Sequence, residues 1–120
     1  MIALVVEDDR SLQTIYGFIL ERVGFKVVAA ADGHQALVAL EVHVPALILL
    51  NMRLPHVPGI EVLRYLRAQE RFKQTRIVVI SAAPPIDREL EGEKFLLKPV
   101  HATVIARIAE ETRSQLANCS

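Results

Sequence analysis

A short, unbroken apolar run in the middle of the chain constrains the fold more than any other feature. Residues 46–50 are all apolar, the run stops at Asn51, and a loop with Pro55, Pro58 and Gly59 follows. An apolar run bounded by turn residues is typical of a strand that is buried on both faces. The carboxyl end of such a strand is where an open α/β sheet places its functional groups. The role of Asn51 is therefore the central question.

The rest of the chain alternates similar runs with helical patterns. The expected strands are 2–6, 26–30, 46–50, 77–80 and 95–97, and helices are expected at 10–23, around 36–40, at 59–69 and from 100 onward. Parallel strands joined by helices need crossover connections, which are nearly always right-handed. We therefore expect an α/β fold, a doubly wound, five-stranded parallel sheet covered by helices on both faces.

Helical spacing also predicts which side chains face the core. The expected inward positions are Leu12, Ile15, Tyr16, Ile19, Leu20 and Val23 in the first helix, Ile60, Leu63 and Leu66 in the third, and Val104, Ile105, Ile108 and Thr112 in the last. Asp9 is the expected N-cap of the first helix, and Gly24 is expected to end it. Arg64 and Arg67 are expected to point outward.

Composition limits the classes of partner. The 120 residues suit one domain, 1–120, and 14 basic residues balance 14 acidic ones, so the charge favours neither nucleic acid nor an anionic membrane. No apolar run approaches the roughly 20 residues of a membrane span. The single cysteine, Cys119, cannot form an internal disulfide, so we expect a cytoplasmic protein.

Five basic residues cluster between positions 64 and 76, namely Arg64, Arg67, Arg71, Lys73 and Arg76. Such a cluster can bind phosphate or nucleic acid. However, cations also stabilise the C-terminal end of a helix, and the stretch lacks interleaved aromatic residues and any recognition motif. We therefore interpret it as a solvated face.

Polar residues follow the apolar runs at corresponding ends. Glu7 and Asp8 follow the first run, and Asn51, Ser81 and Lys98 follow the third, fourth and fifth. Any one of them could simply end its strand. Together, two carboxylates, an amide, a hydroxyl and an ammonium at one edge of a parallel sheet indicate a site for a hard cation and a phosphoryl group.

At this point the chain resembles a known family. The stretches 5–9 (VVEDD), 49–55 (LLNMRLP) with Gly59, 79–82 (VISA) and 95–99 (FLLKP) are similar to the receiver domain of bacterial two-component response regulators. The resemblance spans the whole chain and implies the flavodoxin-like receiver fold, with the strand order 2-1-3-4-5.

The resemblance implies a role for seven positions. Magnesium would be held by Glu7, Asp8, Asn51 and the backbone carbonyl of Arg53, the phosphoryl group would be contacted by Ser81 and Lys98, and the switch positions would be Ser81 and Phe95. Phe95 is also a natural core-filling residue. Asn51 matches the phosphoacceptor, where the family has aspartate.

Asn51 changes the expected chemistry. A carboxylate oxygen can attack phosphorus to form an acyl phosphate, whereas an uncharged carboxamide is a very poor nucleophile. The chain is therefore expected not to accept phosphate at Asn51, to bind Mg²⁺ more weakly than an aspartate-bearing site, and not to be an enzyme. Its expected partner is a sensor histidine kinase or another signalling protein, through protein–protein contacts.

Two alternatives stay open. An ordinary phospho-accepting receiver could carry an introduced Asp-to-Asn substitution at position 51. More remotely, a small flavin- or nucleotide-binding protein could use the same sheet. That second class needs glycine or hydroxyl residues in a phosphate-binding loop, whereas the loop after the first strand is Glu7-Asp8-Asp9-Arg10.

The stretch 82–93 is a second departure from the family. It is shorter by roughly one and a half helical turns, and Pro84 and Pro85 leave only 86–91 for a helix. The fourth helix is thus expected to be shortened or missing. Because that region forms the family's usual dimerisation face, we expect a monomer or an altered dimer.

Two side chains in the loop after Asn51 are further candidates for the pocket. Arg53 could reach across to Glu7, and His56 could touch the pocket, although a surface position is the default for a histidine without ligand partners at metal spacing.

Overall fold

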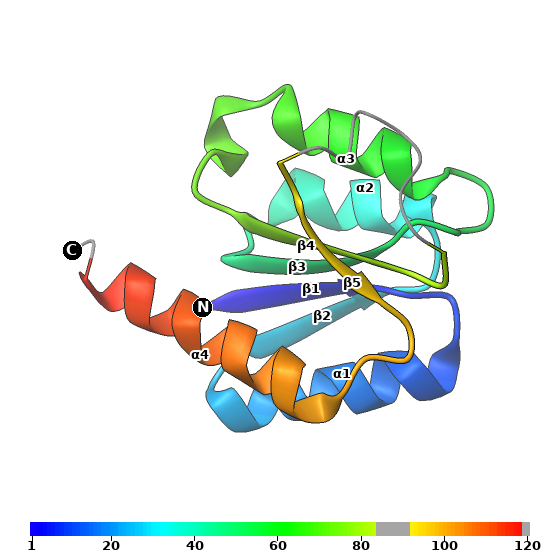
Figure 1. Cartoon of the computed structure of the whole chain (residues 1–120). Coiled ribbons are helices and arrows are strands. Elements are labelled where there is room, and N and C mark those ends of the chain that lie inside the picture. The colour runs from blue at the N-terminus through cyan, green and yellow to red at the C-terminus, as the bar shows by residue number, and fades with distance from the viewer. Residues whose placement is uncertain (84–91, 119–120) are drawn as a thin grey trace.

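The computed structural model describes residues 1–83 and 92–118 of the chain. Its centre is a five-stranded parallel sheet with the order β2-β1-β3-β4-β5 (Figure 1). The strands are β1 Ile2–Val6, β2 Lys26–Ala30, β3 Leu47–Asn51, β4 Arg76–Ser81 and β5 Lys94–Leu97. The predicted α/β fold and strand order are confirmed.

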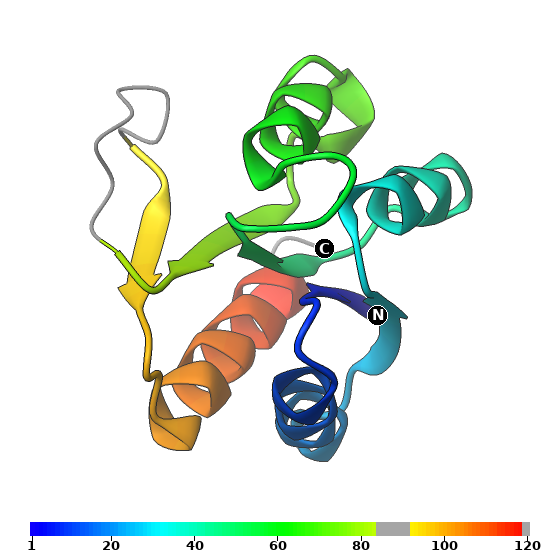
Figure 2. The ribbon, with the colours of Figure 1, turned by 90° about the vertical axis from the view of Figure 1, so that its right-hand side faces the viewer.

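Helices cover both faces of the sheet. Those in the described ranges are α1 Arg10–Val23, α2 Gly33–Val42, α3 Gly59–Arg67, the 3-10 helix η1 Glu70–Phe72 and α4 Ala102–Asn118. The helices α1 and α4 lie on one face, and α2 and α3 lie on the other (Figure 1, Figure 2). Within the described ranges, these helices are neither long nor apolar enough to cross a membrane.

Strand side chains alternate between two apolar cores. Leu4 and Val6 belong to the core under α2 and α3, whereas Ala3 and Val5 belong to the core under α1 and α4. The central strand β3 is buried along its whole length, as its unbroken apolar run predicts.

The predicted ends of α1 are confirmed. The Asp9 carboxylate accepts a hydrogen bond from the Leu12 backbone N–H at 3.1 Å, and Gly24 ends the helix with φ at 113°. The Asp32 side chain caps α2 by accepting a hydrogen bond from the Gln35 N–H at 2.7 Å.

Several other boundaries differ from the predictions. The last helix begins at Ala102 and not at Val100, since the Lys98 N–H still bonds to the Ser81 carbonyl (2.9 Å) and the chain must then pass Pro99. The third helix ends at Arg67, before η1. The expected helical remnant at 86–91 lies outside the described residues.

Most predicted inward positions are buried or partly buried, but the prediction for Ile15 is wrong. Its exposed fraction is 50%, and unlike Leu12 and Ile19 it does not pack against the core under α1 and α4. Val62 is buried in α3 although the spacing argument did not include it.

Candidate functional site

The sheet itself gathers the predicted residues at one edge. Asn51 and Ser81 are the last residues of β3 and β4, and Glu7 and Lys98 directly follow β1 and β5. Ladder hydrogen bonds hold the two flanking residues: the Glu7 N–H donates to Ala30 O at 3.0 Å and the Lys98 N–H donates to Ser81 O at 2.9 Å. The backbone of the sheet therefore fixes the positions from which the Glu7 and Lys98 side chains extend.

The Asn51 side-chain amide lies among three oxygen atoms. Its Nδ2 donates to Glu7 Oε2 at 2.9 Å, to Asp8 Oδ1 at 3.1 Å and to the Arg53 carbonyl at 3.0 Å. The reversed amide would aim Oδ1 at three acceptors, so this hydrogen-bond pattern dictates the orientation. The N–H group thus occupies the centre of the oxygen cluster.

Glu7 is the most enclosed acid of the site, with 1% of its surface exposed. Its Oε1 accepts from Lys98 Nζ at 2.7 Å, and its Oε2 accepts from Asn51 and from the Asp9 backbone N–H at 3.2 Å. A buried carboxylate is tolerated only when it is paired and hydrogen-bonded, and both conditions hold here.

The oxygen atoms of this cluster suit magnesium only if the Asn51 amide moves. Asp8, Glu7 and the Arg53 carbonyl offer the hard oxygen atoms that Mg²⁺ prefers. The Asn51 amide, as oriented, presents N–H groups to that space, and a cation there would require the amide to reverse and lose its three hydrogen bonds. Among the described residues, no three His, Cys, Asp or Glu side chains are grouped to hold a metal ion.

Ser81 ends β4, and Phe95 lies within β5, the neighbouring strand. The Ser81 hydroxyl accepts from the Ala83 backbone N–H at 3.4 Å, and its residue is 9% exposed. Phe95 pairs with Val79 across β4 and β5 and packs, partly buried, against the core under α2 and α3. Both residues therefore belong to the same side of the sheet.

The loop after β3 contributes backbone more than side chains. Arg53 is exposed and enters the cluster through its carbonyl. His56 is directed elsewhere: its Nε2 lies 3.9 Å from Asp32 Oδ2, and its side chain is 74% exposed. A Cβ on Gly59 would lie 2.6 Å from the Asn51 carbonyl, so the close return of this loop requires glycine.

Sequence reasoning did not assign two residues near Glu7 to the site. The Gln13 side chain donates to the Glu7 carbonyl at 3.1 Å from the second turn of α1. Tyr16 is buried beside the acids, and desolvation, followed by the charges of Glu7 and Asp9, raises the pKa of its phenol above 10.0. A polar residue one turn after an N-cap was the only signal available for Gln13.

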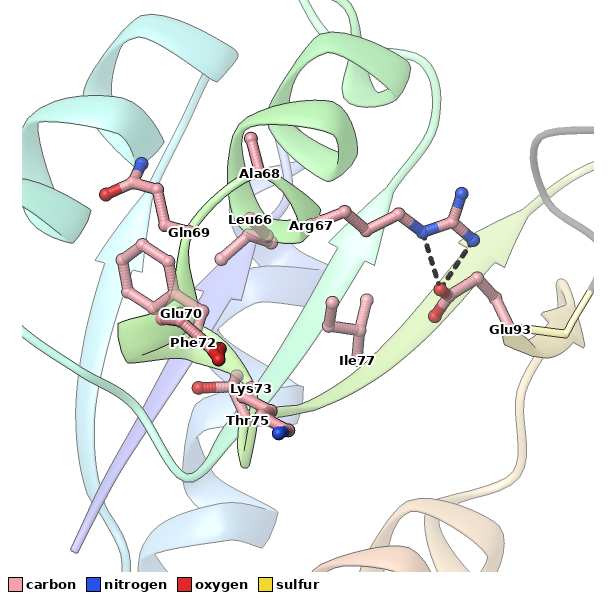
Figure 3. A pocket seen from close by; sticks show the side chains of 10 residues that line it. All are labelled: Leu66, Arg67, Ala68, Gln69, Glu70, Phe72, Lys73, Thr75, Ile77 and Glu93. Atoms are coloured by element: carbon pink, nitrogen blue, oxygen red, sulfur yellow. Dashed lines mark hydrogen bonds and ion pairs between the residues drawn. The ribbon is translucent and has the colours of Figure 1, made fainter.

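The basic stretch is largely occupied by contacts within the chain. Arg64 pairs with Glu61, Arg67 with Glu93, Arg76 with Glu111, and Arg71 lies over the Phe72 ring. Figure 3 shows Arg67 reaching Glu93 beside a cavity of about 570 Å³ that is lined by α3, η1 and β4. These pairings agree with our interpretation of a solvated face, and the cavity lies at the opposite edge of the sheet from Asn51.

Comparisons with known sequences give one consistent family. A family model for the response regulator receiver domain matches residues 3–110. The chain is 45% identical over 100 residues to the alkaline phosphatase synthesis transcriptional regulatory protein PhoP of Bacillus subtilis, covering 80% of this chain and 41% of PhoP. It is 36% identical over 111 residues to the transcriptional regulatory protein CpxR of Escherichia coli, covering 88% and 46%. The chain thus spans less than half the length of these two relatives.

Solved structures give the same result. The receiver domain of the sensor histidine kinase PA1611 from Pseudomonas aeruginosa, solved with a magnesium ion coordinated in its active site cleft, superposes with a TM-score of 0.82 and 32% identity, covering 94% of this chain and 97% of that one. The chemotaxis response regulator CheY4 of Vibrio cholerae shares the fold, with a TM-score of 0.79 and 23% identity over 92% and 97%.

Proposed function

This chain belongs to the response regulator receiver family of two-component signal transduction, and we propose that it signals without accepting a phosphoryl group at Asn51. In this proposal residues 1–120 are one receiver domain. It acts in the cytoplasm, is not an enzyme, and works through contacts with a histidine kinase or another signalling protein.

The position of the Asn51 amide carries the proposal. Its nitrogen donates to Glu7, Asp8 and the Arg53 carbonyl, so the side chain is held by three contacts and is uncharged. An amide nitrogen delocalises its lone pair into the carbonyl and cannot replace the carboxylate that forms an acyl phosphate. Asn51 therefore occupies the phosphoacceptor position without its chemistry.

The same contacts argue for weak metal binding. The receiver domain of PA1611 coordinates magnesium in its active site cleft, and the matching ligands in our proposal are Glu7, Asp8, Asn51 and the Arg53 carbonyl. A bound Mg²⁺ would supply positive charge between these oxygen atoms. Here the Asn51 N–H groups already donate to Glu7, Asp8 and the Arg53 carbonyl, and the site contains one fewer negative charge than it would with aspartate.

The other proposed roles follow the position of each residue. Lys98 and Ser81 are the phosphoryl-contact equivalents, and Ser81 and Phe95 are the switch positions. Lys98 is committed to Glu7 at 2.7 Å, and the Ser81 hydroxyl is engaged by the loop that follows β4. These contacts support one resting arrangement of the site that needs no phosphoryl group to complete it.

One observation favours a second candidate. Glu7, Asp8, Ser81 and Lys98 are all present at the edge of the sheet, so an aspartate at position 51 would complete an ordinary receiver site. The chain could therefore be a phospho-accepting receiver that carries an Asp-to-Asn substitution. The flavin or nucleotide alternative is disfavoured, because the loop after β1 carries three carboxylates.

A phosphodonor reaction tests the proposal. The chain and its Asn51→Asp variant are incubated with acetyl phosphate and Mg²⁺, and intact mass is measured at once, because acyl phosphates hydrolyse. We expect a mass increase of one phosphoryl group in the variant alone, with Asn51→Ala as the unreactive control. Stoichiometric phosphorylation of the unaltered chain would contradict the proposal.

A further inference from the structure

The cavity between α3, η1 and the start of β4 shares no residue with the acidic site. Its volume of about 570 Å³ lies within the usual range of ligand pockets, roughly 300–1,000 Å³. Its floor is apolar: Leu66 is 2% exposed, Phe72 is 3% exposed, and Ile77 is partly buried against the core under α2 and α3. The cavity therefore presents apolar surface to solvent at the edge of the sheet opposite Asn51.

One wall of the cavity is an ion pair. Nε and Nη2 of Arg67 both donate to Glu93 Oε1, at 2.9 Å and 2.6 Å. Figure 3 shows this pair on one side of Ile77 and the η1 side chains on the other. The pair joins the end of α3 to the residue before β5. Because Arg67 and Glu93 neutralise each other, this wall adds no net charge to the cavity.

The opposite wall carries two charges that are not used in this way. The four arginines of the 64–76 stretch contact acids or aromatic side chains. Within residues 1–83 and 92–118, by contrast, no ion pair includes Lys73 or Glu70. Both side chains are exposed and line the cavity.

The backbone places these two charges next to each other. Glu70 begins η1, Lys73 follows its end, and the Lys73 N–H donates to the Glu70 carbonyl at 3.0 Å. Side chains at positions i and i+3 of a 3-10 turn project on the same side. One carboxylate and one ammonium therefore stand side by side at the rim, above an apolar floor.

We propose that this cavity binds an α-amino acid with a large apolar side chain. The carboxylate of the ligand pairs with Lys73, and its ammonium pairs with Glu70. Its side chain lies on Leu66, Phe72 and Ile77, where burial of apolar surface favours binding. The two charges of an α-amino acid are neighbours, as the two charges at the rim are, so one small molecule satisfies both.

The charges of the cavity select this class of ligand over others. A simple anion would pair with Lys73 but meet the like charge of Glu70, and a simple cation would do the reverse. A neutral apolar molecule would cover part of both charged groups without pairing either of them, which is unfavourable. The size of the cavity favours a bulky side chain, because alanine would leave most of the floor uncovered.

Titration of the isotope-labelled chain with L-tryptophan, followed by nuclear magnetic resonance, tests the proposal. We expect saturable shifts of the backbone amides of Phe72, Lys73 and Ile77, with a dissociation constant of about 1 mM or below. The amides of Asn51 and Ser81, at the other edge of the sheet, should stay in place. The result is independent of whether Asn51 accepts phosphate, because the two sites have no residue in common.

Three analogues of the ligand each lack one proposed contact. Indole-3-propionate has no ammonium, tryptamine has no carboxylate, and L-alanine has no large side chain. Each should bind at least about tenfold more weakly than L-tryptophan, since a lost charge-assisted contact or a lost apolar contact costs that much. Analogues that bind as tightly as L-tryptophan would overturn the proposed recognition.

Matched variants assign each charge. Lys73→Gln should weaken L-tryptophan binding by about tenfold and leave tryptamine binding unchanged, because tryptamine has no carboxylate to lose. Glu70→Gln should weaken L-tryptophan binding to the same extent and leave indole-3-propionate binding unchanged. Lys26→Gln, at an exposed lysine of β2, is the control and should have no effect.

Circular dichroism verifies that every variant is folded. The absence of saturable shifts in the unaltered chain would overturn the proposal. Shifts centred outside η1 and the start of β4, or equal binding by Lys73→Gln, Glu70→Gln and the unaltered chain, would overturn it as well.

Discussion

The Lys98 ammonium lies 2.7 Å from Oε1 of Glu7, a carboxylate that is 1% exposed. The other oxygen of the same carboxylate accepts from Asn51. One acid therefore connects the end of β1 to the ends of β3 and β5, and it is neutralised by a cation 91 positions away in the sequence. The contacts of Glu7 therefore contribute to the stability of the fold as well as to the site.

The first prediction concerns that ion pair. Lys98→Met keeps most of the length of the side chain but leaves the Glu7 charge buried without its cation, so we expect unfolding in urea to show a loss of about 3 kcal/mol. The double variant Glu7→Gln/Lys98→Met removes both charges and should recover most of the loss. A change below about 1 kcal/mol in Lys98→Met would mean that the pair contributes no more than an exposed salt bridge.

The convergence of Glu7, Asp8, Asn51, Ser81 and Lys98 could be predicted because parallel strands place their carboxyl ends at one edge. The identity of each contact could not. The sequence does not reveal which carboxylate oxygen of Glu7 is contacted by Lys98. It also does not reveal that Asn51 turns its nitrogen toward three acceptors. Both depend on the side-chain rotamers inside the assembled site.

The limits of helical periodicity have a similar origin. Spacing identified the inward face of α1 correctly except at Ile15, which is 50% exposed. Spacing also missed the 3-10 turn at Glu70–Phe72, because three residues are too few to show a period. Local patterns predict which elements form, but neighbouring elements decide what each residue at their edges contacts.

The second prediction addresses the charge at position 51. Asn51→Asp replaces the NH2 group and its two N–H donors with one oxygen atom and crowds a third carboxylate against Glu7 and Asp8, so without metal we expect a loss of about 2–4 kcal/mol. Mg²⁺ should restore much of it, because the cation replaces the lost positive ends of the amide dipole. Thermal melts with and without Mg²⁺ measure both effects, and Asn51→Ala, which adds no charge, should respond far less to the metal.

The absence of any magnesium response in Asn51→Asp would count against this oxygen cluster as a metal site. The unaltered chain should itself show a smaller magnesium-dependent shift in melting temperature than the aspartate variant.

The third prediction compares two buried glycines. A Cβ at Gly59 would lie 2.6 Å from the Asn51 carbonyl and 2.8 Å from the Met52 Cα, so Gly59→Ala must displace the backbone that positions the site. We expect a loss of about 2 kcal/mol or more in chemical denaturation. Gly17→Ala is the control: its Cβ would meet only Val27 Cγ1 at 3.6 Å, and alanine inside α1 should stabilise the fold by about 0.5–1 kcal/mol. Equal effects of the two substitutions would show that the close return of the loop at Asn51 is not rigid.

The fourth prediction concerns alkaline pH and Tyr16. Burial and, next, the charges of Glu7 and Asp9 raise the pKa of this phenol above 10.0 in the folded chain, while the unfolded chain keeps the ordinary value. Between the two values the folded state holds the proton more tightly, so this contribution to stability is complete below pH 10 and is lost as the pH rises through the folded pKa. Phenolate absorbance should reveal a late-titrating component that disappears in Tyr16→Phe, and Glu7→Gln should move this component to lower pH. The decline of stability above pH 10, followed by urea unfolding, should be shallower in Tyr16→Phe than in the unaltered chain. If Glu7→Gln leaves the late titration where it was, burial and the charge of Asp9 raise the pKa without a contribution from Glu7.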